Sequence, residues 1–188
     1  MIVKHIGGKR VECVEGDITK QPGFDAVVNA ANAELVPGGG VAGAIHRAAG
    51  PELAEACRAL APIRPGEAVI TPAFRLPNRF VIHCLGPVFG RDEPAAELLA
   101  SCYVNALKRA EEHRLHSIAF PAISTGAFGY PLPEAAEVAV QAVLFTLPKL
   151  RHVGLVRFCL FGQEAYRVFA GALATHACSS AGGWQPEE

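Results

Sequence analysis

The chain has 188 residues and a mass of 19.8 kDa, which is enough for one domain with a full hydrophobic core. Apolar residues make up 51% of the chain and charged residues 19%, a balance that excludes disorder throughout. The formal net charge of −1 argues against a nucleic-acid binder with a broad basic face.

Membrane and secreted classes are also disfavoured. The sequence has no run of about 18 uncharged apolar residues, and its first ten residues lack the apolar stretch of a secretion signal. The six cysteines have mostly apolar neighbours and no Cys-x-x-Cys spacing. This pattern indicates buried, reduced thiols rather than a disulfide framework or a zinc site. We therefore expect a cytoplasmic protein with no membrane partner, no metal and no cofactor.

Apolar runs bounded by turn residues alternate with longer helical patterns along the chain. The first half predicts strands and one helical segment, in the order 10–14, 26–28, 41–60 (helical), 68–74 and 79–84. The second half predicts helices over 94–113, 132–147 and 162–176, with strands over 117–123 and 153–161. This alternation is typical of an α/β fold whose sheet is covered on both faces, and the closely spaced early strands indicate a mixed sheet. We expect one domain over residues 1–176 and a flexible tail over 177–188.

Three segments follow apolar strands, where open α/β sheets bind their ligands. The first contains Asp17, directly after Gly16 and the first predicted strand. A carboxylate at this place can accept a hydrogen bond from an amine such as the exocyclic amine of adenine. Asp and Thr are also common in turns and helix caps, and the motif taken alone favours that simpler interpretation.

The second segment combines two asparagines with a glycine run. Asn29 and Asn32 leave a buried strand, and an amide can hold a sugar diol or a water without a charge. Gly38–Gly40 stand at the start of a helix, where missing Cβ atoms let backbone N–H groups approach a phosphate. A plain flexible loop would also be rich in glycine, but its place between the asparagines and the helix favours a phosphate site.

The third segment is a small-residue loop over 121–131. Ser124, Thr125 and the loop N–H groups can bind a second set of phosphate oxygens. Phe128 has little local core to join, so stacking on a sugar or base explains it better than packing does. Two anion-binding loops on neighbouring strand ends predict a diphosphate, and the acid and the aromatic residue predict a nucleotide base.

The same motifs resemble the macrodomain family, with the MacroD-like ADP-ribose hydrolases as the nearest branch. The similarity runs in order from about residue 10 to residue 175 and rests on these segments: Gly16–Ile18, Val28–Asn32, Gly38–Val41, Ile82–His83, Gly86–Pro87 and Ile123–Pro131. It implies a three-layer α/β/α sandwich with a central mixed sheet. It also implies binding of ADP-ribose, and hydrolysis of O-acetyl-ADP-ribose or of ADP-ribose joined to Glu or Asp of a protein.

The resemblance assigns roles to individual residues. For the adenosine half it implies that Asp17 holds the adenine amine, Ile18 offers an adjacent backbone contact and Phe161 stacks on the base. For the distal ribose it implies Asn29, Asn32 and Phe128. For the diphosphate it implies a first loop of Gly38, Gly39, Gly40 and Val41, and a second loop of Ser124, Thr125, Gly126, Ala127 and Phe128.

One position departs from the MacroD-like pattern. Ala42 stands where those members carry an aspartate that is a proposed catalytic group, and Pro37 replaces their first loop glycine. The viral branch shares the alanine, so we expect hydrolysis by a metal-free, substrate-assisted route. In it, a water held between the diphosphate and the first loop at Gly40 attacks near the distal-ribose C1″, while Asn32 orients the reacting centre. Ala42 also leaves open, as the alternative, a reader of ADP-ribose or ADP-ribosylated proteins that performs no chemistry. The neutral charge disfavours a third class, binders of RNA or poly(ADP-ribose).

Two histidines near these motifs receive structural roles. We expect His83, on a strand, to be a core histidine with satisfied hydrogen bonds. We expect His46, one turn into the helix after the glycine run, to bond a neighbouring backbone group.

Overall fold

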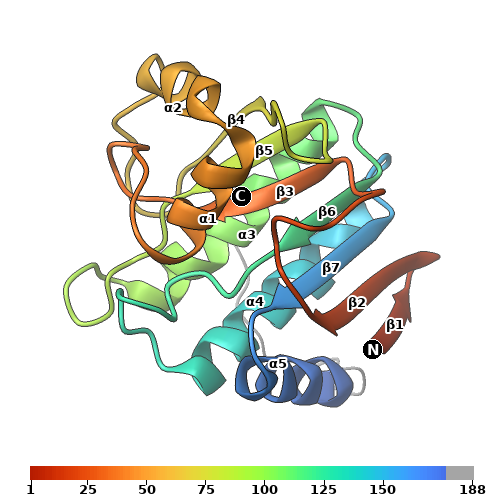
Figure 1. Cartoon of the computed structure of the whole chain (residues 1–188). Coiled ribbons are helices and arrows are strands. Elements are labelled where there is room, and N and C mark those ends of the chain that lie inside the picture. Colours follow the sequence, from red (N-terminus) through yellow and green to blue (C-terminus); the bar gives the residue numbers. More distant parts are fainter. Residues whose placement is uncertain (177–188) are drawn as a thin grey trace.

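One mixed sheet of seven strands organises the protein (Figure 1). The computed structural model describes residues 1–176, so the predicted flexible tail over 177–188 lies outside the described residues. The strand order is β1-β2-β7-β6-β3-β5-β4. The strands are β1 (Ile2–Ile6), β2 (Lys9–Glu15), β3 (Ala26–Ala30), β4 (Ala68–Pro72), β5 (Phe80–Cys84), β6 (Ser117–Phe120) and β7 (Leu155–Leu160). The five central strands are parallel, whereas β1 and β4 are antiparallel edge strands.

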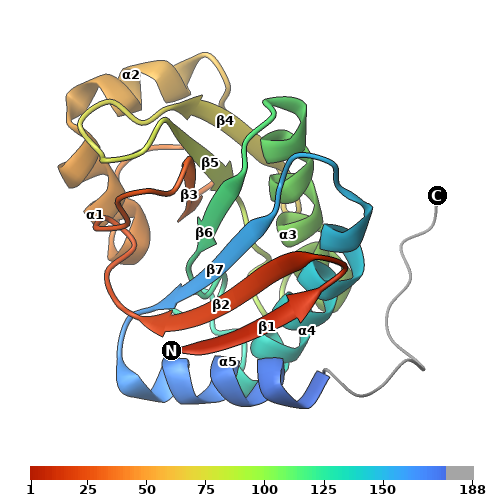
Figure 2. The same ribbon diagram turned by 90° about the vertical axis from the view of Figure 1, so that its right-hand side faces the viewer.

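Helices cover both faces of the sheet, which confirms the predicted α/β/α sandwich (Figure 2). They are α1 (Gly40–Ala49), α2 (Pro51–Arg58), α3 (Ala95–Glu112), α4 (Leu132–Thr146) and α5 (Gln163–Thr175), with a short 3₁₀ helix over Leu147–Lys149. One apolar core lies between the sheet and α3, α4 and α5, and a second lies between the sheet and α1 and α2. No helix among residues 1–176 is long and apolar enough to cross a membrane.

Besides small shifts at the ends of elements, the structure differs from the predicted elements at three places. Strand β1 was not predicted, although Gly7 and Gly8 form the two-residue hairpin turn that joins it to β2. The helical segment over 41–60 is two helices, because Gly50 has φ +91° and Pro51 starts a new helix. Strand β6 ends at Phe120, since Pro121 has no N–H to continue the ladder.

A chain of polar side chains crosses the core beneath α1 and α2. His83 is fully buried, with Nδ1 3.1 Å from Asn29 Nδ2 and Nε2 2.9 Å from Thr71 Oγ1. The Thr71 hydroxyl donates to the carbonyl oxygen of Pro72, so His83 carries its proton on Nε2 and accepts at Nδ1. The prediction of a satisfied core histidine is therefore confirmed. Burial lowers the pKa of His83 to about 3, so the ring stays neutral in the folded protein.

This neutral histidine predicts a specific loss of stability in acid. The unfolded chain binds a proton at His83 below pH 6.5, whereas the folded chain does so only near pH 3. The contribution of the neutral His83 ring to the free energy of unfolding is therefore fully present above pH 6.5, and it is lost as the pH falls from 6.5 to 3. When the pH is lowered from 7 to 4.5, we expect the free energy of unfolding of His83→Gln to fall by about 2–3 kcal/mol less than that of the parent, as measured by urea unfolding.

His5→Gln is the matched control, because the His5 side chain is exposed and has no hydrogen bond among the described residues. This control should follow the parent at both pH values. If His83→Gln kept the parent's full pH dependence, the assignment of the effect to His83 would be wrong.

Candidate functional site

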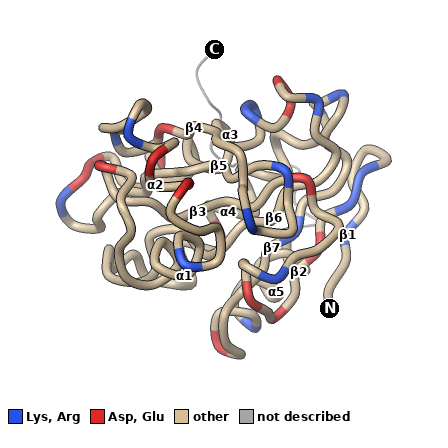
Figure 3. Tube along the Cα trace, turned by 45° about the horizontal axis from the view of Figure 1, so that its top comes forward, with Lys and Arg blue, Asp and Glu red and all other residues tan. Residues whose placement is uncertain are grey.

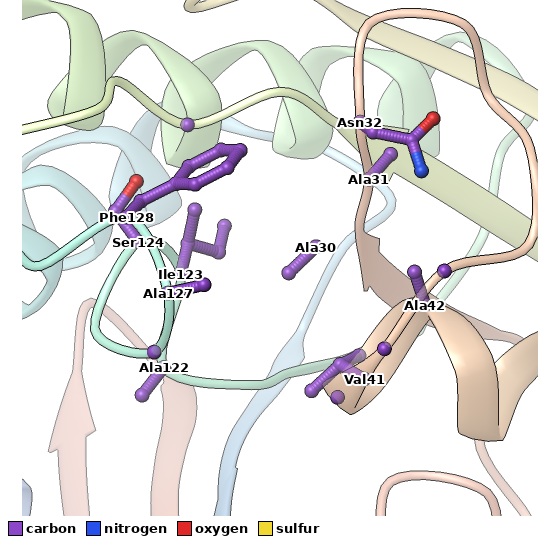
Figure 4. Close-up of a pocket in the computed structure, with 15 residues that line it drawn as sticks. Ala30, Ala31, Asn32, Val41, Ala42, Ala122, Ile123, Ser124, Ala127 and Phe128 are labelled. Carbon is purple, nitrogen blue, oxygen red and sulfur yellow. The ribbon is translucent and has the colours of Figure 1, made fainter.

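A cavity of about 350 Å³ opens at the carboxyl edge of the sheet, between the loops that follow β3 and β6 (Figure 4). Asn32, Val41 and Ala42 lie on one side of it, and Ser124 and Phe128 lie on the other. The wall is completed by Ala30, Ala31, Gly38, Gly39, Gly40, Gly86, Ala122, Ile123, Gly126 and Ala127. The structure thus brings the second and third sequence motifs together around one space.

The first loop, residues 31–39, is closed by its own asparagine. The Asn32 amide donates from Nδ2 to the Val36 carbonyl at 2.8 Å, and Val36 N–H donates back to Asn32 Oδ1 at 3.0 Å. The loop then lies directly on α1, because a Cβ atom at position 43 would be 2.3 Å from the carbonyl oxygen of Gly38. Gly43 is therefore required for this close approach.

The amino end of α1 faces the cavity with its donors free. Its N-cap is Gly39, which offers no side-chain cap, and its first turn contains no acidic residue. Within residues 1–176, the N–H groups of Gly40, Val41 and Ala42 have no backbone acceptor outside the helix. Free N–H groups and the positive end of the helix dipole make this a place for an anion.

The second loop, residues 121–131, is held in a tight conformation. Ser124 has φ +67° and is buried, and a Cβ atom at position 86 would lie 2.0 Å from its Oγ. In the described part of the chain, the N–H groups of Gly126, Ala127 and Phe128 have no backbone acceptor. Thr125 does not line the cavity, since its hydroxyl donates to the Ala122 carbonyl at 3.0 Å.

The described wall of the cavity offers polar atoms but no ionisable side chain. Of the described residues that line it, only Asn32 and Ser124 have polar side chains. Basic and acidic residues are interspersed along the described chain (Figure 3). No group of three His, Cys, Asp or Glu side chains that could hold a metal occurs in residues 1–176. Backbone N–H groups are therefore the main means of holding an anion here.

Asp17 and Phe161 lie outside this cavity, side by side at the ends of β2 and β7. Glu15 pairs with Leu160, and Gly16 N–H donates to the Leu160 carbonyl at 2.9 Å. The Phe161 side chain is 88% exposed, which leaves an aromatic ring free to stack on a ligand. Strand β7 neighbours β6, so this second surface continues along the edge to the second loop.

The Asp17 carboxylate is ionised, and one of its two oxygens is available to a ligand. Its Oδ1 accepts the N–H of Thr19 at 2.9 Å and the hydroxyl of Thr19 at 2.7 Å. These two bonds lower the pKa of Asp17. Oδ2 has no hydrogen bond in the described chain and can accept one from an amine. The neighbouring Ile18 side chain is buried in the core, so only its backbone is available to a ligand.

Asn29 requires a correction. Its side chain is 1% exposed, donates to His83 and does not line the cavity. The alternation of the strand explains this, since Asn29 points with Val27 into the core under α1 and α2. A contact between the Asn29 side chain and a ribose is therefore not supported by the geometry.

His46 also differs from the expectation. The ring is buried, and neither nitrogen has a hydrogen-bond partner among residues 1–176, so the predicted bond to a backbone group is wrong. Burial lowers the pKa of His46 and keeps it neutral. His46 lies one helical turn after Ala42, and this spacing is visible in the sequence. The lack of a hydrogen-bond partner for its ring among residues 1–176 is decided by tertiary packing.

Comparisons with known proteins agree with this geometry. The Macro domain family model matches residues 28–139. A macro domain-containing protein of Chlorobaculum tepidum is 52% identical over 165 residues, covering 87% of this chain and 95% of that protein. An O-acetyl-ADP-ribose deacetylase of Salmonella typhimurium is 48% identical over 169 residues, covering 87% and 94%.

Solved structures show the same similarity. The Oceanobacillus iheyensis macrodomain with ADP has a TM-score of 0.88 and 43% identity, over 92% of this chain and 94% of that one. The Trypanosoma brucei macrodomain in complex with ADP-ribose has a TM-score of 0.81 and 35% identity, over 87% and 68%. A family match over more than half of the chain, together with relatives of this identity and coverage, shows that the chain belongs to the Macro domain family.

Proposed function

We propose that this protein binds ADP-ribose and hydrolyses its esters, namely O-acetyl-ADP-ribose and ADP-ribose linked to Glu or Asp of a protein. The observation that carries the proposal is the row of sites along the carboxyl edge of the sheet. It starts at Asp17 and Phe161, continues to the second loop and ends at the first loop. The deacetylase name of the Salmonella typhimurium relative and the ADP-ribose in the Trypanosoma brucei structure support it.

Each part of the ligand has a place in this row. Adenine stacks on Phe161 and donates its amine to Asp17 Oδ2, with the Ile18 backbone beside it. The diphosphate accepts hydrogen bonds from the free N–H groups of the two loops, with Gly38–Val41 on one side and Ser124–Phe128 on the other. Thr125 takes part through its backbone, because its hydroxyl is engaged by Ala122. The distal ribose lies in the cavity between Asn32 and Phe128.

Hydrolysis in this site uses the substrate's own charge. A water held at Gly40 attacks near C1″ of a carboxylate-linked ADP-ribose, and a diphosphate oxygen accepts one of its protons. The C1″–O bond breaks, the carboxylate leaves with its oxygen, and the hydroxyl of the water ends on the ribose. No side chain has to act as a base, so the rate comes from positioning and from backbone dipoles.

A reader without catalytic activity is the second candidate, and Ala42 is the observation that favours it. Ala42 lines the cavity, where it can neither accept a proton nor orient a water. A missing general base costs about 10²–10⁴-fold in rate, which is enough to turn an enzyme into a binding module. Binding without turnover would identify this alternative.

Replacing Asp17 tests the recognition of adenine. Asp17→Asn keeps an oxygen for the two bonds from Thr19 but replaces the free acceptor with an amide NH₂. We expect ADP-ribose to bind about 10- to 100-fold more weakly, as measured by calorimetric titration. The control Glu97→Gln, which removes an exposed carboxylate on α3, should bind like the parent. Unchanged binding by Asp17→Asn would refute the adenine assignment.

Turnover distinguishes the two candidate functions. We expect the parent to release acetate from O-acetyl-ADP-ribose and ADP-ribose from a glutamate-modified protein, and Asn32→Ala to reduce both rates by about 10²-fold. Asn105→Ala is the matched control, because its amide also donates to a carbonyl, that of Gly66, but on α3. Tight binding with no release from either substrate would reject the hydrolase and favour the reader.

The backbone of the first loop can be tested without changing a polar group. Gly43→Ala places a Cβ atom against the Gly38 carbonyl and must displace the loop, so ADP-ribose should bind at least about tenfold more weakly. Gly171→Ala is the control, because no atom beyond its chain neighbours and the backbone of its own helix lies within 4 Å of the new Cβ. It should stabilise α5 by about 0.5–1 kcal/mol and leave binding unchanged. Full affinity in Gly43→Ala would show that the loop conformation is not needed.

A further inference from the structure

The loop that carries Asp17 is hydrogen-bonded to a network of polar side chains that are largely buried. This loop, residues 16–25, joins β2 to β3 without a helix or strand of its own. Gln21 lies within it and is 5% exposed, although glutamine is usually a surface residue. Its Nε2 donates to the Asp17 carbonyl at 2.8 Å, and its Oε1 accepts from Arg157 Nη1 at 3.0 Å. Both ends of this amide are therefore engaged, one of them by the backbone of Asp17.

Arg157 is itself held on three sides. It extends from β7 and donates from Nε to Glu12 Oε2 at 2.8 Å, and its guanidinium lies 4.5 Å from the centroid of the Phe24 ring. Glu12 is 4% exposed, and its other oxygen lies 2.7 Å from Arg10 Nε, so this buried carboxylate faces two guanidinium groups. Because a guanidinium is planar and rigid, the bond of Nε to Glu12 sets the direction of Nη1.

The fixed orientation of the Arg157 guanidinium determines the orientation of the Gln21 amide. Arginine has only donors, so Gln21 must present its oxygen to Arg157 and its NH₂ group to the Asp17 carbonyl. The far end of the loop is fastened separately, since Asn78 Nδ2 donates to the carbonyls of Gln21 and Phe24, both at 2.8 Å. The Gln21 bond is therefore the side-chain link that ties the backbone of Asp17 to the sheet through Arg157.

We propose that Gln21, oriented by Glu12 and Arg157, is a positioning residue that sets the selectivity of the site for the base of the ligand. By holding the backbone of Asp17, it keeps Oδ2 where it meets the amine of adenine. The inference rests on the proposed function, because it assumes that Asp17 faces the base. A role in folding alone would change stability, whereas a positioning role changes the discrimination between bases.

The test compares two ligands whose bases differ in the group at C6 and, with it, in whether N1 carries a proton. Inosine diphosphate ribose carries a carbonyl where ADP-ribose carries the amine, so it offers the Asp17 carboxylate an acceptor in place of a donor. We expect the parent to bind ADP-ribose at least about tenfold more tightly than the inosine analogue. In Gln21→Met, which has a side chain of similar length and no hydrogen bonds, the ratio of the two Kd values should fall to within about threefold of one.

A second variant and a control make the result specific. Gln21→Glu still accepts from Arg157 but turns an oxygen toward the Asp17 carbonyl, so its Kd ratio should fall as well. Gln141→Met makes the same chemical change on α4, where the Gln141 side chain has no hydrogen bond among the described residues, and should keep the parent ratio. Thermal melting of each variant confirms that the measured protein is folded.

The outcomes separate the two proposals. A parent that binds neither ligand overturns the proposed function, and with it this inference. A parent that discriminates, with Gln21→Met and Gln21→Glu showing the same ratio at whatever affinity, overturns the inference alone. A lower ratio in both variants and a parent-like ratio in Gln141→Met support Gln21 as a positioning residue.

Discussion

The parallel alignment of β2, β7, β6, β3 and β5 is the constraint on which the rest of the structure depends. Parallel strands end at the same edge of a sheet, so the loops that follow them meet there regardless of their distance in sequence. The loop after β3 and the loop after β6 thereby face each other across one cavity. The same edge continues to β7 and β2, where Phe161 and Asp17 stand. The edge therefore offers an elongated ligand a series of contacts from β2 to β3 rather than one deep pocket.

Backbone groups rather than charged side chains make the cavity suitable for an anion. Asn32 and Ser124 are the polar side chains in its described wall, and the remaining donors are N–H groups of two glycine-rich loops. Such donors cost no side-chain entropy on binding and need no counter-ion when the site is empty. They do require close packing of backbone on backbone, which is why Gly43 and Gly86 stand at the two tightest contacts. The ability of this site to hold an anion therefore depends on the backbone conformation of the two loops.

The polar groups beneath this edge have a different function from those at its surface. His83 and Asn29 are buried side by side under α1, where the His83 ring bonds both Asn29 Nδ2 and Thr71, while Asn29 Oδ1 has no hydrogen bond among the described residues. On the same face of the sheet, farther along the edge at β2 and β7, Arg157 and the buried Glu12 form an ion pair that supports the loop of Asp17. A buried, hydrogen-bonded polar group permits few alternative arrangements, because each unpaired atom would cost free energy. These groups stiffen the positions from which the loops extend.

The sequence by itself determined the local features of this protein, and tertiary packing decided the rest. Periodicity and turn residues predicted the alternating strands and helices, and the resemblance indicated the family, because both depend on neighbouring residues. Local patterns do not predict the inward direction of Asn29, the hydrogen bonds of Gln21 or the lack of a partner for the His46 ring among the described residues. The bond between Arg157 and Gln21 joins residues 136 positions apart, and that between Arg157 and Glu12 joins residues 145 apart. No local pattern encodes such a pair, since only the register of β2 on β7 brings the partners together.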